Sequence, residues 1–209
     1  MATGHAWVTK ALSNTENYRP LTNDLAESDS RRAIESDDRN QAGEPLGAEF
    51  FPKRLWPSLD VPARNQPLGD FFFANSVWVV SERLAQTLTR FDLGEGHLYP
   101  VTLFQHDGVT PTGRIYFSIN FGNRKQALLP DLSAGLRKTF NNDFRLKGVV
   151  NDDDIKLQSS ALSGPDLWID PLLLGAFFVS DRLHSALLEL DGWQGFNAFR
   201  RCAVRPSSP

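Results

Sequence analysis

The stretch VVSERLAQTL at residues 79–88 occurs again as FVSDRLHSAL at residues 178–187, 99 positions further along the chain. Each copy begins with β-branched or aromatic residues, which are typical of a buried strand. A serine follows, Ser81 or Ser180, where it can cap a helix by accepting a hydrogen bond from the first turn. The acid after each serine suits the positive end of the helix dipole, and leucines four apart give the helix one apolar face. The repeat predicts two strand–helix units that share a core, with Ser81 and Ser180 as structural helix caps.

Length and composition indicate a folded protein with little net charge. The 209 residues suffice for one sizeable core or for two small lobes that share an interface, and 41% of them are hydrophobic. The 22 basic and 25 acidic residues give a net charge of -3, which argues against a strongly basic nucleic-acid-binding protein. We expect no nucleic acid among its partners.

The cysteine content and the hydropathy of the sequence indicate the cellular compartment of the protein. The single cysteine, Cys202, excludes an internal disulfide and a cysteine-based zinc site within one chain, and its apolar neighbours predict a buried side chain. The N-terminal sequence lacks the charged start and apolar core of a secretory signal. The apolar stretches fall far short of the roughly 20 residues that a membrane span needs. We therefore expect a cytoplasmic protein without membrane contact.

The chain divides by composition into three parts. Residues 1–49 read as a polar, partly irregular N-terminal arm, residues 50–205 as the main domain and residues 206–209 as a tail. A few apolar anchors within residues 1–20 predict one edge strand or a loose arm. The domain organisation is therefore one folded domain preceded by an arm.

Residues 21–45 are the most polar part of the sequence. So few apolar residues separate the charges that a short solvated helix or a mobile loop is expected. The alternative is a charged arm that docks on a partner through Glu35, Asp37 and Asp38.

Alternating apolar and polar residues predict the remaining strands. Residues 98–104 and 114–120 flank a turn-rich loop and predict a hairpin. Asp131 or Ser133 is in a position to cap a short helix that runs to Phe140. Further strands are expected at these three segments: residues 144–150, 155–157 and 196–204. Antiparallel hairpins between two strand–helix units predict an α+β fold, a single domain with a mixed, largely antiparallel sheet on which the two units pack.

The motifs of common catalytic and metal sites are missing from the sequence. It contains no Gly-x-Ser-x-Gly elbow, no phosphate-binding glycine loop and no histidine pair at metal-ligand spacing. Asp152, Asp153 and Asp154 lack the glycine and the distal glutamate of a calcium loop. They predict a solvated hairpin turn or, alternatively, a patch that contacts a basic partner. We expect no catalytic residue, no metal and no cofactor, although paired carboxylates can be far apart in sequence.

Most of the tryptophans lie among apolar residues and are expected in the core. Trp168 and Trp193 flank the second copy of the repeat near turns. One of them is expected to reach an interface with a partner, because tryptophan is enriched in protein contacts.

The order of several short motifs resembles that of a known family. The runs FDLGEGHLYPV at residues 91–101 and IYFSINF at residues 115–121 are followed by DLWID at residues 166–170. The second copy of the repeat and Gly195-Phe196 come next. This succession, over residues 70–204, is similar to the immunity protein 11 family of bacterial polymorphic-toxin systems.

The resemblance implies an immunity protein that neutralises a toxin encoded beside it, often an effector of type VI secretion. It supplies no catalytic residues. Without a secretory signal, the toxin is expected to act in the cytoplasm, as a nuclease, a deaminase or an NAD-consuming enzyme does. Acidic clusters can occupy the phosphate path of a basic nuclease cleft, where complementary charge mainly speeds association. An interaction or scaffold domain without a toxin partner is the alternative, followed by a small hydrolase. The sequence leaves the oligomeric state and the contact surface open.

Overall fold

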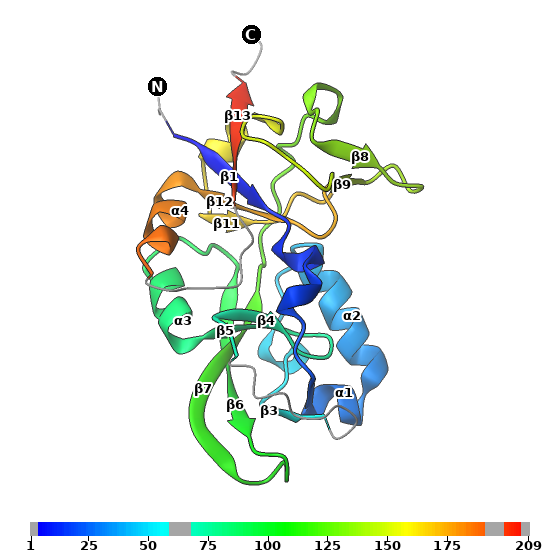
Figure 1. The fold of residues 1–209 in the computed structure, drawn as a ribbon, viewed down its shortest axis with the longest axis vertical. Coiled ribbons are helices and arrows are strands. Elements are labelled where there is room, and N and C mark those ends of the chain that lie inside the picture. Colours follow the sequence, from blue (N-terminus) through cyan, green and yellow to red (C-terminus); the bar gives the residue numbers. More distant parts are fainter. Residues whose placement is uncertain (1–3, 59–67, 191–198, 206–209) are drawn as a thin grey trace.

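The structure, a computed structural model, describes residues 4–58, 68–190 and 199–205. It shows the predicted α+β fold, with strands in the majority (Figure 1). The strands are β1 (Ala6–Thr9), β2 (Leu21–Asn23), β3 (Arg54–Pro57), β4 (Phe71–Phe73), β5 (Trp78–Ser81), β6 (His97–Phe104), β7 (Pro111–Asn120), β8 (Leu136–Lys138), β9 (Phe144–Leu146), β10 (Lys156–Gln158), β11 (Leu167–Trp168), β12 (Phe177–Ser180) and β13 (Arg200–Arg205). The helices are α1 (Asp24–Ser28), α2 (Ser30–Gln41), α3 (Glu82–Leu88) and α4 (Asp181–Leu188).

The strands form two larger sheets and a separate hairpin. One sheet has the order β11-β12-β1-β13-β10, and the other has the order β4-β5-β7-β6-β3-β2. β8 and β9 form a two-stranded sheet, in which Phe144 of β9 also bridges Leu173, and they project from the side of the molecule (Figure 1). Each larger sheet contains one of the two predicted strand–helix units, β5 with α3 and β12 with α4.

The two larger sheets repeat one topology. Five strands follow in corresponding order, β4-β5-β7-β6-β3 in one sheet and β11-β12-β1-β13-β10 in the other. In both series the first four strands are antiparallel neighbours. The last pair, β6 with β3 and β13 with β10, is parallel in both. The molecule therefore consists of two pseudo-symmetric halves, the β5–α3 half and the β12–α4 half, and the sequence repeat is the visible part of this duplication.

The chain crosses between the halves twice, in equivalent ways. β1 lies in the β12–α4 half, after which the chain enters the other half, where Tyr18 bridges Phe73 and β2 pairs with β3. After β7 the chain crosses in the opposite sense, and Arg124 bridges Ile169 directly after β11. Phe73 and Ile169 hold corresponding positions, each three residues after the aspartate that precedes β4 or β11. Each half is thus completed by a segment from another part of the chain.

The largest hydrophobic core lies between the halves. Side chains of β5 alternate, so that Val80 points into this shared core and Val79 into an outer core; Val179 and Phe178 of β12 do the same. α3 and α4 pack into the shared core and contact each other. Among the described residues, hydrophobic clusters cover both faces of each sheet, and the two halves form a single domain.

The predicted edge strand or loose arm at residues 1–20 is wrong, because β1 has a strand on each side. Ala6 lies opposite Ser180 of β12 and opposite Cys202 of β13. Its partners are about 170 to 200 positions away in sequence, so no local pattern could show that the strand is internal. Cys202 is fully buried, as predicted, and burial raises the pKa of its thiol well above the usual range.

The helix predicted for residues 21–45 exists as α2, preceded by β2 and the short α1. It is solvated on one side only, since Ala33, Ser36 and Asn40 are buried. The prediction of a helix between Asp131 and Phe140 is wrong. The Ser133 hydroxyl accepts a hydrogen bond from the Lys156 amide and so joins β10, which leaves β8 free to pair with β9.

The predicted hairpin at residues 98–104 and 114–120 is confirmed as β6 and β7. The strands expected at residues 144–150, 155–157 and 196–204 correspond to β9, β10 and β13, with ends shifted by several residues in the described part of the chain.

Candidate functional site

The second copy of the repeat contains a buried polar cluster around one carboxylate. Asp166, 1% exposed, lies opposite Ser180 and accepts hydrogen bonds from the Ser180 hydroxyl and from the backbone amide of Asp92. The Arg182 guanidinium donates Nε and Nη2 to the two carboxylate oxygens, both at 2.6 Å. The Ser180 Oγ also accepts the Leu183 amide at 3.2 Å and is the N-cap of α4. One carboxylate thus joins β11, the start of α4 and the loop that follows α3.

The first copy repeats this cluster. Asp70 accepts hydrogen bonds from the Ser81 hydroxyl, at 2.6 Å, and from the Arg83 guanidinium. Ser81 is the N-cap of α3, with its Oγ 3.3 Å from the Leu84 amide. The serine and the arginine of each copy therefore have structural roles, because they join the start of a helix to the neighbouring strand. A search at constant spacing misses the two aspartates, since 11 residues separate Asp70 from its serine and 14 separate Asp166 from its serine.

A ring stack joins β1 to α4. Trp7 of β1 stacks on His184 with 3.7 Å between the ring centroids, and its Nε1 donates to the Asp181 carboxylate at 2.8 Å. Burial lowers the pKa of His184. The acid that follows the helix cap therefore has a second use, because it also holds the N-terminal strand.

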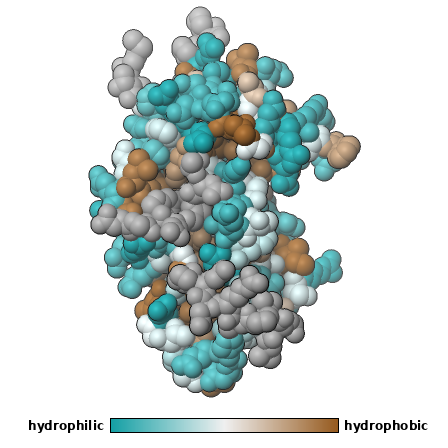
Figure 2. Space-filling model, viewed as in Figure 1, coloured by the Kyte–Doolittle hydropathy of each residue, from teal (hydrophilic) through white to brown (hydrophobic). Residues whose placement is uncertain are grey.

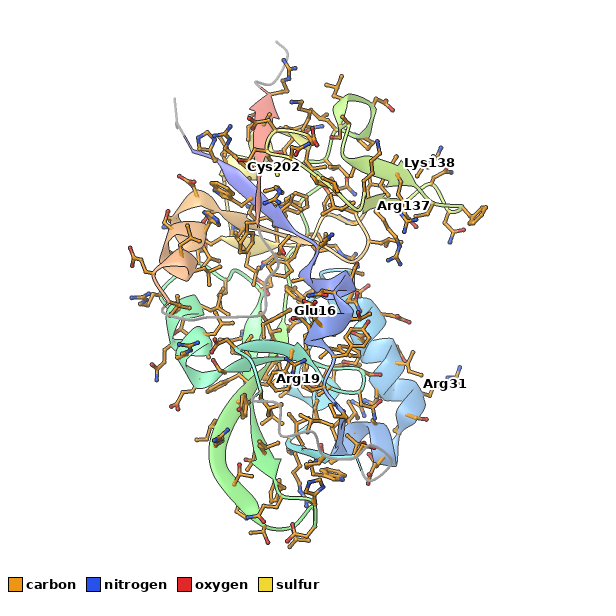
Figure 3. The ribbon with its side chains drawn as sticks, in the orientation of Figure 1. Glu16, Arg19, Arg31, Arg137, Lys138 and Cys202 are labelled. Carbon is orange, nitrogen blue, oxygen red and sulfur yellow. The ribbon has the colours of Figure 1, made fainter. Side chains whose placement is uncertain are left out.

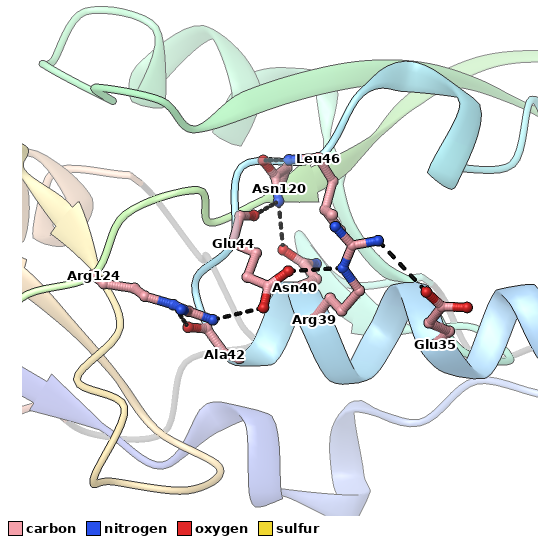
Figure 4. A network of polar contacts seen from close by, with 8 residues as sticks. All are labelled: Glu35, Arg39, Asn40, Ala42, Glu44, Leu46, Asn120 and Arg124. Atoms are coloured by element: carbon pink, nitrogen blue, oxygen red, sulfur yellow. Dashed lines mark hydrogen bonds and ion pairs between the residues drawn. The ribbon is translucent and has the colours of Figure 1, made fainter.

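A polar network fastens α2 to the end of β7 (Figure 4). The Asn40 side chain donates to the Ile119 carbonyl at 2.8 Å and accepts from Asn120 Nδ2 at 3.0 Å. The carboxylate of Glu44 lies between Arg39 at 2.7 Å and Arg124 at 2.8 Å. Its pKa is lowered, chiefly by the hydrogen bond from Arg39. These charges are matched within the protein and fix the arm on the sheet.

The acidic turn at residues 152–154 uses its carboxylates to hold β13. Asp152 accepts the backbone amide of Arg201 at 2.9 Å, and the Arg201 guanidinium binds Asp153 with a closest distance of 2.6 Å. The Arg201 guanidinium lowers the pKa of Asp153. Asp154 accepts the Asn151 amide at 2.8 Å within the turn. The three acids therefore have partners inside the chain, and their contact with a basic partner stays a prediction.

The three predicted contact acids of α2 differ in exposure. Glu35 and Asp38 are exposed, and Glu35 lies 3.5 Å from Arg39. Asp37 is half-buried, and burial raises its pKa to about 6. Asp38 lines a groove of about 440 Å³ whose wall also includes Arg145 of β9. Glu35 and Asp38 are thus open to a partner, whereas Asp37 is largely withdrawn from solvent.

The prediction that Trp168 contacts a partner is wrong, because its side chain is fully buried. Its ring is stacked on Phe178 with 5.6 Å between centroids, and the Lys125 ammonium lies 3.8 Å from the ring centroid. Burial lowers the pKa of Lys125 to about 8. Trp168 is a core residue because β11 places it on the outer face of the sheet, in the same hydrophobic cluster as Leu157 of β10. Trp193 lies outside the described residues.

The β8–β9 hairpin is the exposed feature that the sequence reasoning missed. Arg137 and Lys138 are labelled on it in Figure 3, and both are exposed. In Figure 2 a hydrophobic tip projects at the right, where Figure 1 places this hairpin. Phe140, between the two strands, is fully exposed at 108%. In the sequence, the basic residues on both sides of Asn141-Asn142 could have indicated this hairpin.

Within residues 4–58, 68–190 and 199–205, no three acidic, histidine or cysteine side chains come together as metal ligands. None of the helices described there has the length and apolarity to cross a membrane.

Comparison with known proteins assigns the chain to a family. No curated protein sequence matches it significantly. The profile of the Immunity protein family (Imm11) matches residues 27–204, which include α2 and both strand–helix units but not β1 or β2. This match extends further towards the N-terminus than the motifs on which the resemblance rested. The chain therefore belongs to the Immunity protein family (Imm11).

Proposed function

We propose that this protein neutralises a cognate antibacterial toxin by binding it in the cytoplasm. The observation that carries the proposal is the family match over residues 27–204. The fold supports a binding role, because both sheets are covered on both faces and form a stable support for exposed loops. Inhibition then occurs by covering the active site of the toxin or by blocking a movement that the toxin needs.

Exposed carboxylates are one proposed contribution to the contact. Glu35 and Asp38 on α2 are open to solvent and are available to a basic cleft, whereas Asp152 and Asp153 of the acidic turn already hold β13. Opposite charges across an interface would mainly raise the association rate.

Co-expression with the toxin tests the proposal. We expect the intact chain to restore the growth of bacteria that produce the toxic domain encoded beside this gene, and the purified proteins to form a complex. A toxin that is encoded elsewhere serves as the control and should not be neutralised. If the neighbouring gene encodes no toxic domain, or if growth is not restored, the chain is an interaction domain of another kind.

A further inference from the structure

We propose that the β8–β9 hairpin, residues 136–147, is the element that docks on the toxin, at an acidic surface around an apolar pocket. The inference rests on the proposed function, and it names the contact element and the chemistry of the surface that this element recognises.

Charge distinguishes the hairpin from the rest of the chain. It contains four exposed basic residues and one acid, a net charge of +3, whereas the whole chain carries -3. The four basic residues are Arg137, Lys138, Arg145 and Lys147. The remaining residues thus carry -6, so that the hairpin is a cationic projection on an acidic protein. Such a projection is attracted by carboxylates on a partner.

The pairing within the hairpin places two like charges together. Arg137 lies directly opposite Arg145 in the β8–β9 register. Like charges in facing positions destabilise a pair of strands. Among the described residues, no hydrogen bond or ion pair joins either guanidinium to an acid. A carboxylate between the two guanidinium groups would remove the repulsion and accept several charged hydrogen bonds.

Apolar exposure is concentrated in the same place. Phe140 at 108% and Val149 at 80% are the most exposed of the large apolar side chains in the described chain. Burying a phenylalanine side chain is favourable, and this fold leaves the Phe140 ring exposed. An aromatic tip beside arginines is the composition found at the energetic centre of protein interfaces.

The base of the hairpin is anchored, while its tip is free. Leu136 and Leu146 face each other and pack on the outer core of the β12–α4 half. Backbone hydrogen bonds join Phe144 to Leu172 and Leu174, both at 2.8 Å. An element held in this way presents its tip in one orientation, which lowers the entropy lost on binding.

The same charge and aromatic content would also suit a single-stranded nucleic acid. The rest of the molecule disfavours this partner, because its net charge of -6 would repel a phosphate backbone beyond the hairpin. A folded protein with a local acidic surface meets the hairpin without that repulsion. A protein is therefore the class of partner that we infer.

The experiment measures binding of the toxic domain encoded beside this gene to variants of the full chain. Phe140→Ala and the double variant Arg137→Glu/Arg145→Glu should each weaken binding by 10-fold or more. The difference in association rate between the wild type and the double variant should shrink as the salt concentration is raised, because salt screens the charges. Matched controls are Val109→Ala, 73% exposed at the β6–β7 tip, and the exposed pair Arg90→Glu/Arg114→Glu. These should change affinity by less than about 2-fold, and thermal unfolding should show that all variants are folded.

The outcomes separate the two proposals. A wild-type chain that neither binds the toxin nor restores growth would overturn the proposed function and this inference with it. A wild type that binds, together with hairpin variants that bind equally well, would overturn the inference alone. The inference would also be overturned if Glu35→Gln/Asp38→Asn abolished toxin binding and the hairpin changes did not. Tight binding of a single-stranded oligonucleotide that the hairpin variants abolish would overturn it as well.

Discussion

Asp37 and Asp170 are two acids whose pKa is raised by burial, but their surroundings differ. Asp170 is 1% exposed and accepts backbone amides at both carboxylate oxygens, which counteract the effect of burial. Asp37 accepts one side-chain hydrogen bond, from Gln41 at 3.0 Å, and its Oδ1 is buried without a partner among the described residues. The buried carboxylate of Asp170 is thus stabilised by hydrogen bonds, whereas a charged Asp37 destabilises the fold.

Replacement of Asp37 with asparagine should stabilise the protein at neutral pH. The pKa of Asp37 is about 6 in the folded state, against 3.8 in the unfolded reference. Because the unfolded chain loses this proton more readily, the wild type is relatively most stable below pH 3.8 and loses stability as the pH rises towards 6. We expect Asp37→Asn to gain about 1–3 kcal/mol at pH 7 and almost nothing at pH 4. Urea unfolding at both pH values measures this.

The control is Asp38→Asn, at the exposed neighbouring position, which should change stability by less than about 0.5 kcal/mol. Equal unfolding midpoints for wild type and Asp37→Asn at pH 7 would show that the carboxylate is better solvated than its burial indicates.

At the scale of the elements, the beginnings of α3 and α4 are the points where each half is tied together. A helix cap alone needs only a serine, but here the capping hydroxyl also donates to the aspartate before the neighbouring strand. The arginine two positions later binds the same carboxylate while its own side chain is largely exposed, 65% for Arg182. Strand pairing and the start of the helix therefore depend on one another.

Ser180→Ala should lower the free energy of unfolding by about 1–2 kcal/mol. The change removes the cap of α4 and one hydrogen bond to the buried Asp166. Ser185→Ala, on the exposed side of the same helix, is the control and should cost less than about 0.5 kcal/mol. Denaturant unfolding of both variants gives these values. The folded Ser180→Ala protein should still bind its partner, as should Ser81→Ala, and loss of binding would show that the serine is a contact residue.

At the scale of the whole molecule, the duplication explains why the first and the last strand lie together. β1 and β13 are antiparallel neighbours in one sheet, so the start of β1 and the end of β13 lie on the same side (Figure 1). In the β5–α3 half, the corresponding strands β7 and β6 are joined by a hairpin loop. The loop that joins β6 to β7 in one half therefore has no counterpart between β13 and β1 in the other half.

A circular permutant should fold. A short glycine–serine linker would join the present ends, and the new chain would begin at Val149 and end at Gly148, both exposed between β9 and β10. This order makes each half more continuous, and we expect the free energy of unfolding to stay within about 2 kcal/mol of the wild type. Circular dichroism and denaturant unfolding measure the result. A second permutant, opened between Ser81 and Glu82, breaks a helix cap and should fail to fold. Failure of both would show that the connection at residue 148 is needed.

The sequence by itself determined the parts of this protein that depend on local chemistry. The strand–helix units at Ser81 and Ser180 and the β6–β7 hairpin could be predicted, because capping, alternation and turn residues act over a few positions. Three features were decided only in the tertiary structure: the place of β1 between β12 and β13, the burial of Trp168 and the projection of β8 and β9. Each depends on partners distant in sequence, and a short apolar or charged segment does not specify which distant strand covers it. The candidate contact surface belongs to this second group, because exposure is a property of the assembled halves.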